Sequence, residues 1–578
     1  MKRESKSSKT TQQATDRSGH GTDRRGFVLA ASASLLAAGG LRPGDLIAHG
    51  PSVITKRRAH DLVIRGGTVF DGLGNAGVEM DVAVAGGRIV DVARRITEAG
   101  TEEIDAKGLA VAPGFIDIHS HGDGNMDEDP RQESVVRQGV TTIVVGQDGS
   151  SRAPRARAQS SGAEPGEEST NSFNAVFAAI DRLQPSVNVA SMIGLGSVRA
   201  AVVGPDDRPA TPAEMARMVA IVETALAQGA CGASSGLEYT PGAFAPLAEL
   251  IELCKPLASR RLPYSTHMRN EDDQVLESID ESIAVARGAR CPLQIAHLKM
   301  QGPRNWNKLD TAFARIAAAR NDGLDVAFDR YPYIAYQTGL TNLFPTWSRD
   351  GGTRPFLARL DSASVAPRIK TYTLDKVELI GGWDNVLVAS ARAAEDRPAE
   401  GKRLGAYAKS LGQDPYELAV AMLKRNGGSV GMVGFAMSEE NLDRLLAHPY
   451  GMVCSDGGAF ATDGPTRRGS PHPRGAGSFP RVIAKYVRER KAITLEQAIH
   501  KMTALPASRV RLADRGRLAR NMAADIVVFD AATIADTATY EQPFGYPTGI
   551  AATIVNGAVV LRDGQRDARR TGKVLRPQ

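Results

Sequence analysis

Residues 112–123 read APGFIDIHSHGD, and this stretch decides how the chain is interpreted. The apolar run 115–118 is typical of a buried strand, and it ends in His119-Ser120-His121. Residues i and i+2 of an extended chain point the same way, so the two imidazoles leave the strand together. Neutral imidazole is a ligand that suits zinc and similar metals. The pair is weak evidence alone and becomes strong if other strands end in further ligands.

Other predicted strands do end in residues that can bind a metal. The segments are TTIVVGQDG (141–149), PYSTHMRNE (263–271), PLQIAHLKM (292–300) and GMVCSDGG (451–458). They supply Asp148, His267, His297 and Asp456. Because the carboxyl ends of barrel strands meet at one rim, we expect His267, His297 and Asp456 to surround a divalent ion with His119 and His121, and Asp148 ends the strand after that of His119. An Asp-Gly pair is also common turn chemistry, so a turn role for Asp148 stays open.

The chain around these segments alternates between apolar strands and longer helical stretches. This alternation over 113–505 predicts an α/β fold with a parallel sheet, and its length fits a (β/α)₈ barrel of the TIM type. Gly-punctuated, β-branched strands flank it at 58–112 and 506–578. We expect these two flanks to form one small β-sandwich domain built from both chain ends, with 1–57 as a leader and linker.

Composition narrows the class of protein. Hydrophobic residues make up 42% of the 578 and charged residues 24%, which excludes a disordered chain. Residues 1–58 hold 11 Lys/Arg and 4 Asp/Glu, which leaves 60 basic and 61 acidic residues in the remainder. The basic excess therefore belongs to the leader, and nucleic acid is a poor candidate partner. Four cysteines without CxxC spacing exclude a zinc knuckle and are expected to be small buried hydrophobes.

The leader carries an export pattern. Residues 22–28 read TDRRGFV and precede an Ala-rich apolar run that ends at Leu41. Paired arginines before an apolar run of about 14 residues, too short to span a bilayer, are similar to a twin-arginine signal. We expect an exported protein, periplasmic or secreted, that meets the export machinery and has no stable membrane anchor. The alternative is a disordered basic N-terminus with a chance arginine pair.

Taken together, the segments resemble the D-aminoacylase (N-acyl-D-amino-acid deacylase) family of the amidohydrolase superfamily. PGFIDIHSH, SSGLEYTPG, THMRNE, DRYPY and AIHKMTALPA carry the resemblance, with others between residues 60 and 560. Two positions depart from the family pattern. GQDG at 146–149 stands where the family has GNCG, so Asp148 replaces a cysteine ligand, and Leu195 replaces the histidine of a GHG motif. We interpret the replacement of this histidine by Leu195 as a change in a loop or in the residues that support the metal ligands.

The resemblance implies metal-dependent hydrolysis of a linear amide, with one or two zinc ions or another divalent metal. The expected substrate is an N-acyl-D-amino acid, which is split into a carboxylate and a D-amino acid. Asp456 would accept a proton from the attacking water and return it to the leaving amine. Residues expected to bind the substrate carboxylate are Lys299, Tyr331 and Tyr333, with Arg269, Arg474 and Glu238 as weaker candidates.

Three alternatives remain open from the sequence. A dipeptide with a C-terminal D-residue offers the same amide and carboxylate. A cyclic-amide hydrolase of the hydantoinase or dihydropyrimidinase type uses a carboxylated lysine as a metal bridge, and no lysine ends a strand before His267. The alternative that is not an enzyme is a periplasmic binding protein on an inactive barrel, against which the retained histidines and Asp456 argue.

Overall fold

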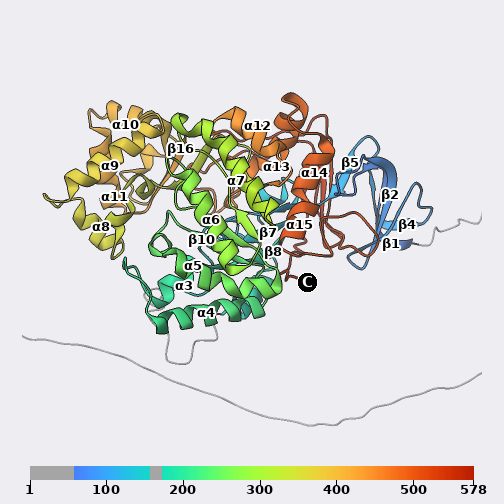
Figure 1. Ribbon diagram of the computed structural model, residues 1–578. Coiled ribbons are helices and arrows are strands. Elements are labelled where there is room, and N and C mark those ends of the chain that lie inside the picture. The colour runs from blue at the N-terminus through green and yellow to red at the C-terminus, as the bar shows by residue number, and fades with distance from the viewer. Residues whose placement is uncertain (1–57, 156–171) are drawn as a thin grey trace, which may run out of the picture. The chain divides into compact units, whose positions relative to one another are not determined.

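Parallel strands form the centre of the computed structural model, which describes residues 58–155 and 172–578 (Figure 1). Three pair in the order β6-β7-β8, and six more in the order β17-β13-β12-β11-β10-β9. All of these pairings are parallel. The strands are β6 (Phe115–Asp117), β7 (Val140–Val145), β8 (Asn188–Ser191), β9 (Ile193–Gly194), β10 (Ala233–Gly236), β11 (Tyr264–His267), β12 (Leu293–Ile295), β13 (Val326–Arg330) and β17 (Gly451–Val453).

Hydrogen bonds join the two groups into a closed ring. Met192 alone separates β8 from β9, and its N–H donates to the Val145 carbonyl at 2.9 Å, so β8 and β9 are one strand. At the other edge, the N–H of Asp456 donates to the His119 carbonyl at 2.8 Å. The N–H of His121 donates to the Gly457 carbonyl at 2.9 Å, which places the end of β17 beside the end of β6. The predicted eight-stranded barrel is confirmed.

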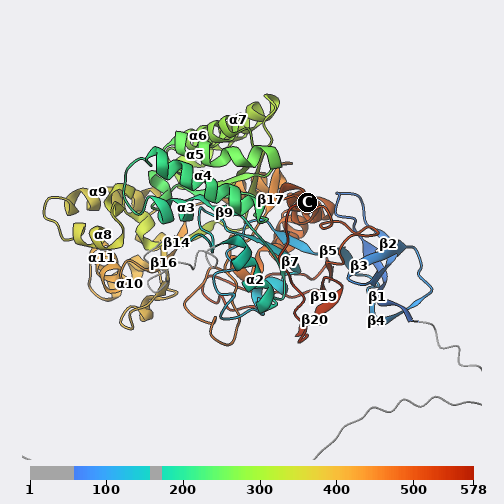
Figure 2. The same ribbon diagram turned by 90° about the horizontal axis from the view of Figure 1, so that it is seen from below.

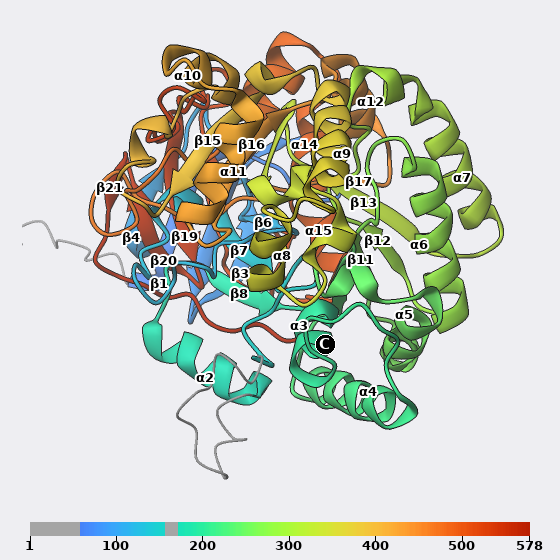
Figure 3. The same ribbon diagram turned by 90° about the vertical axis from the view of Figure 1, so that its left-hand side faces the viewer.

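Helices surround the barrel, and α4 to α7 pack against one another in chain order along its outer side (Figure 3). Helix α4 (Pro212–Ala227) shows why the sequence forms such an element. Thr211 caps it, since its hydroxyl accepts from the Glu214 N–H while the Glu214 carboxylate accepts from the Thr211 N–H. Its buried residues Met218, Val222, Ala225 and Leu226 repeat with helical spacing, which turns one face to the strands. The other helices around the barrel are α1 (Glu133–Val136), α2 (Phe173–Leu183), α3 (Leu195–Val202), α5 (Leu247–Cys254), α6 (Val275–Ala289), α7 (Leu309–Asn321), α12 (Glu439–Ala447), α13 (Arg474–Arg481), α14 (Leu495–Met502) and α15 (Ala504–Arg509).

Strands from both ends of the described chain share one sheet, as Figure 2 shows for the blue and red strands. Its main path runs β21-β20-β19-β18-β5-β1-β2-β3, and β4 pairs with β1. The two chain ends meet where β18 pairs antiparallel with β5. The prediction that both ends build one β unit is consistent with this pairing, while the sandwich form and its boundaries stay predictions. The strands are β1 (Arg58–Val69), β2 (Val78–Ala85), β3 (Arg88–Ala93), β4 (Ala99–Asp105), β5 (Ala110–Pro113), β18 (Ile526–Phe529), β19 (Ile550–Val555), β20 (Ala558–Arg562) and β21 (Gln565–Arg566).

An insertion between β13 and β17 was not predicted. It holds an antiparallel sheet in the order β14-β16-β15 and four α-helices, yellow to orange in Figure 1. A small apolar cluster includes Leu387 and Val433 of the insertion, while most of its core, such as Phe356, packs in one cluster with barrel residues such as Ile116 and Val144. The elements are β14 (Ala335–Gly339), α8 (Thr353–Arg359), α9 (Ala366–Leu379), β15 (Val386–Ala391), α10 (Leu404–Ser410), α11 (Pro415–Arg425) and β16 (Val430–Phe435).

Two other sequence predictions concern cysteines and membrane segments. All four cysteines are buried and free, as expected for small hydrophobes. Across 58–155 and 172–578, none of the helices has both the length and the apolar character needed to cross a membrane. The twin-arginine pattern lies outside the described residues.

Candidate metal centre

The six predicted metal ligands come from the carboxyl ends of five barrel strands. Two follow β6, one follows β7, one ends β11, one lies two residues beyond β12, and one lies three residues beyond β17. They are His119, His121, Asp148, His267, His297 and Asp456. The structure brings them together as the sequence predicted.

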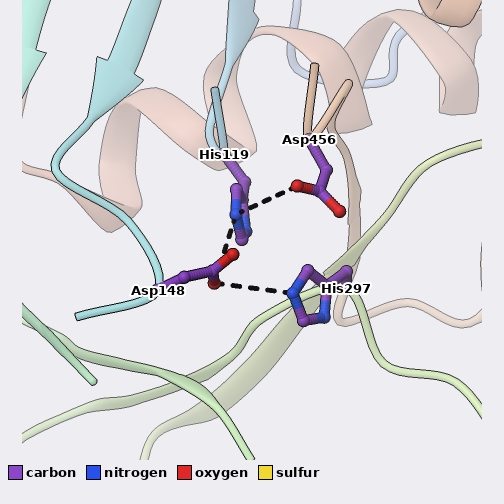
Figure 4. Close-up of side chains that lie close together, drawn as sticks. All are labelled: His119, Asp148, His297 and Asp456. Carbon is purple, nitrogen blue, oxygen red and sulfur yellow. Dashed lines mark ion pairs between the residues drawn. The ribbon is translucent and has the colours of Figure 1, made fainter. Parts of the chain in front are cut away.

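Asp148 contacts four imidazoles of the group, and Figure 4 shows its ion pairs with His119 and His297. Its Oδ1 is 3.4 Å from Nε2 of His119 and 3.5 Å from Nε2 of His297, and its Oδ2 is 3.3 Å from Nε2 of His121. Asp456 Oδ1 is 3.6 Å from Nε2 of His119 and 3.2 Å from Nε2 of His121. Nδ1 of His267 is 3.0 Å from Nε2 of His297. Two ligands on one tetrahedral zinc, each bonded at about 2.0–2.1 Å, lie about 3.3 Å apart, so these separations fit shared ions.

Several nitrogen and oxygen atoms of this group that could bind a metal have no hydrogen-bond partner among the described residues. Nε2 of His119 and Oδ1 of Asp148 are buried and face each other without a hydrogen bond, and Nε2 of His267 is buried in the same way. An unpaired buried polar group costs about 1–3 kcal/mol, and such groups are rare in native proteins. A coordinated cation accounts for them, and the nitrogen and carboxylate oxygens present are ligands that zinc accepts.

The electrostatics of the group favour a positive charge. Burial lowers the pKa of His121, yet the Asp148 and Asp456 carboxylates outweigh it and raise that pKa to about 9. Burial opposes ionisation of Asp456, but the charges of Arg474 and His119 hold its pKa well below the usual range. The carboxylates therefore stay ionised at neutral pH, and a divalent ion can replace the protons that the imidazoles attract.

Three of the ligands sit on strained backbone. Asp148, His297 and Asp456 have φ of 52°, 35° and 49°, in the left-handed region that non-glycine residues rarely adopt. Such conformations persist where the surroundings enforce them, and they gather at functional sites. Three of the strand ends that bring the candidate ligands together therefore carry backbone strain.

Two carboxylates behind the histidines were missed by the sequence analysis. Asp329 Oδ1 lies 3.4 Å from Nδ1 of His119, and Glu271 Oε1 lies 3.1 Å from Nδ1 of His297. A carboxylate on Nδ1 fixes the imidazole so that Nε2 faces the metal, as in many metal sites. The signals were present: Glu271 lies four residues after His267, and Asp329 is an acid inside the apolar strand β13.

The ligand group opens into a cavity of about 720 Å³ that Lys299, Arg474 and Glu238 line. Lys299 Nζ donates to Glu271 at 2.5 Å and lies 2.7 Å from Nδ1 of His297. Arg474 Nη1 donates to Asp456 Oδ2 at 2.7 Å, and its Nε has no partner among the described residues. Glu238 accepts from Asn342 at 2.8 Å and orders the cavity wall.

The other three predicted substrate residues do not line this cavity. Arg269 pairs with Glu281 of α6 at 2.9 Å and donates to two backbone carbonyls. The Tyr333 hydroxyl lies 3.5 Å from the Pro473 carbonyl, and Tyr331 is buried behind Arg474, whose guanidinium carbon is 4.8 Å from the tyrosine ring centre. Arg269 and Tyr333 are engaged within the fold, whereas the Tyr331 hydroxyl is buried without a partner among the described residues. His472, not predicted as a ligand, is also structural and contacts the Ala335 carbonyl at 3.0 Å.

A closed β/α barrel with histidines and carboxylates converging at its carboxyl rim defines the class of metal-dependent barrel hydrolases. The comparison with protein families places the chain within that class. Residues 102–561 match the Amidohydrolase family, and the chain belongs to it.

Comparisons with individual proteins show which members of the family this chain is similar to. The N-acyl-D-aspartate deacylase of Alcaligenes xylosoxydans xylosoxydans is 35% identical over 528 residues, covering 89% of this chain and 95% of that protein. The D-aminoacylase of the same organism is 34% identical over 521 residues, covering 89% and 97%. The crystal structure of an N-acyl-D-glutamate deacylase from Bordetella bronchiseptica, complexed with zinc and a phosphonate inhibitor, has a TM-score of 0.75 and 34% identity, and the match covers 89% of this chain and 99% of that one.

The two departures noted in the sequence have different consequences. Asp148 occupies the centre of the ligand group, where both of its oxygens face imidazole nitrogens. Leu195 is buried in the hydrophobic core and does not line the cavity, whereas its neighbour Gly196 does. The first change alters the donor set, and the second leaves it intact.

Proposed function

We propose that this protein is a metal-dependent deacylase of N-acyl-D-amino acids that uses zinc. The observation that carries the proposal is the convergence of His119, His121, Asp148, His267, His297 and Asp456 at the barrel rim, where two overlapping groups could each hold an ion. The Bordetella relative holds zinc, and the named relatives act on N-acyl-D-amino acids.

The residues of this chain divide the work of amide hydrolysis. When bound, the divalent ion would polarise the amide carbonyl and lower the pKa of water in the site. Asp456, ionised at the edge of the ligand group, is placed to accept the water proton and pass it to the leaving nitrogen. Arg474 lines the cavity with an unpartnered Nε among the described residues, which suits the substrate carboxylate. Glu271 and Asp329 keep the imidazoles oriented.

The proposal is tested with zinc-loaded protein and a panel of mirror-image N-acetyl amino acids, following release of free amine. We expect turnover of D-substrates and at least a hundredfold lower kcat/KM for the L-forms. Dipeptides with a C-terminal D-residue and hydantoins belong in the same panel. Faster turnover of either would replace the deacylase assignment, and stoichiometric binding without any turnover would favour a binding protein.

We also propose that the protein is exported to the periplasm or secreted by the twin-arginine route. The supporting pattern is TDRRGFV at 22–28 followed by the apolar run to Leu41. Fusing residues 1–57 to a folded reporter tests it. We expect export that fails when Arg24 and Arg25 are both changed to Lys. Export that persists in that variant, or a reporter retained in the cytoplasm, would contradict the proposal.

A further inference from the structure

The charged residues of the cavity lining gather around the ligand group, and two of them, Glu238 and Arg474, also contact neutral lining residues. Six charged side chains line it: Asp148, Glu238, Glu271, Asp456, Lys299 and Arg474. Each of them is in the ligand group or contacts a member of it. Glu238 Oε2 is 3.5 Å from Nε2 of His267, and Arg474 is bonded to Asp456. Lys299 and Glu271 are bonded to each other beside His297.

Apart from the three histidines of the ligand group, the rest of the described lining consists of uncharged residues. It includes Ser197, Tyr239, Tyr336, Gln337, Thr338 and Asn342, with glycines and Ala200. Three of these residues come from β14, the first strand of the insertion. The Gln337 side chain accepts from the His472 N–H at 3.3 Å, and the Thr338 hydroxyl lies 3.3 Å from the Tyr239 hydroxyl, whereas the Tyr336 hydroxyl is buried without a partner among the described residues.

The two cations of the lining are already committed. Lys299 is 2% exposed and neutralises Glu271, so its charge is not free for a ligand. Arg474 Nη1 pairs with Asp456 and its Nη2 donates to the Gln337 carbonyl at 3.4 Å, so only its buried Nε, without a partner among the described residues, remains for the α-carboxylate of an N-acyl amino acid. No further lysine or arginine of the described chain lines the cavity. A second carboxylate on the substrate would therefore enter the cavity without a cation to receive it.

We propose that this enzyme takes N-acyl-D-amino acids with uncharged side chains and discriminates against N-acyl-D-aspartate and N-acyl-D-glutamate. The inference rests on the deacylase function proposed above. It separates this chain from the N-acyl-D-aspartate deacylase that it resembles at 35% identity. The physical reason is that a buried carboxylate without a partner loses its hydration and gains no compensating charge.

Matched pairs of substrates test the charge alone. N-acetyl-D-glutamine and N-acetyl-D-glutamate have nearly the same shape, as do the asparagine and aspartate pair. With zinc-loaded protein we expect kcat/KM about 100-fold higher for each amide than for its acid. Equal values, or faster turnover of the acids, would overturn the inference while leaving the deacylase function standing. Failure to turn over any N-acyl-D-amino acid, including leucine and methionine derivatives, would remove both.

A substitution in the neutral wall, which we define as the β14 residues Tyr336, Gln337 and Thr338, tests which part of the cavity discriminates between the acid and amide substrates. Thr338→Arg adds a cation to the wall, and Thr338→Met adds a side chain without charge. We expect the arginine variant to raise the glutamate-to-glutamine ratio of kcat/KM at least tenfold, while the methionine variant leaves that ratio unchanged. Because the ratio is taken within one variant, a general loss of activity does not affect it. A ratio that stays the same in Thr338→Arg would contradict the placement of the substrate side chain against this wall.

Discussion

The two ends of the barrel carry buried polar groups of opposite character. At the carboxyl ends, Nε2 of His119 and Oδ1 of Asp148 are buried without a hydrogen bond from any described residue. At the amino ends, the Arg509 guanidinium is also buried, but its Nε donates to Gln294 at 3.0 Å, its Nη1 to Asp325 at 2.9 Å, and its Nη2 to the Leu293 carbonyl. Unsatisfied groups mark a place that binds a ligand, whereas satisfied ones hold the fold.

The largest expected effect is at the carboxyl end, at Asp456. Asp456→Asn keeps the size of the side chain and tolerates the left-handed backbone, but it cannot accept a proton. We expect kcat to fall by about 10³-fold or more while metal stays bound and the melting temperature changes little. Kinetics, metal analysis and thermal unfolding on one preparation check this. Near-native turnover would remove Asp456 from the chemistry.

The next change separates the ligand and turn roles of Asp148. Asn also tolerates a φ of 52°, so Asp148→Asn preserves a turn while removing the carboxylate charge. We expect zinc affinity to fall at least about tenfold, with the melting temperature of the metal-free protein unchanged. The measurement is a competitive zinc titration. If the variant binds zinc as the parent does, Asp148 is a turn residue only.

At the amino end of the barrel, we expect a substitution to lower the stability of the fold and to leave kcat unchanged. Arg509→Met leaves Gln294, Asp325 and a backbone carbonyl without their donor, and should reduce the free energy of unfolding by about 1–3 kcal/mol. Because Arg509 does not line the active cavity, kcat per folded molecule should stay the same. Denaturant unfolding and kinetics check the two halves of this prediction. A loss of kcat without a loss of stability would contradict the contrast between the two ends.

A smaller effect at the amino end depends on pH. Lys501 donates to the His448 and Gly451 carbonyls just before β17, and burial lowers its pKa to about 8. Between pH 8 and 10 the folded protein releases this proton, whereas the unfolded chain keeps it up to a pKa of about 10.4. The free energy of unfolding, taken relative to Lys501→Met, should therefore rise by about 2 kcal/mol over that range. Parallel pH profiles for the two proteins would show that Lys501 is not perturbed.

The same contrast explains what the sequence could predict. Strand-end histidines and acids are visible one by one in the sequence, and barrel geometry together with the family resemblance predicts that they converge, which is where the structure places them. Arg269 and Tyr333 do not line the cavity, because they contact Glu281 and Pro473. No local sequence pattern connects either residue to its partner. The insertion from β14 to β16 was missed because its strands and helices have the same periodicity as those of the barrel. The neutral wall is part of β14, the first strand of that insertion, so only the structure could reveal that it lines the cavity.

The central claim is that residues distant in the sequence hold a divalent ion at the carboxyl rim, and an anomalous difference map of zinc-loaded crystals tests it most directly. The claim predicts one or two zinc peaks among His119, His121, Asp148, His267, His297 and Asp456, with bonds of about 2.0–2.2 Å to the side chains that coordinate each ion. Zinc bound elsewhere, or a zinc-loaded crystal with no peak among these six side chains, would contradict it.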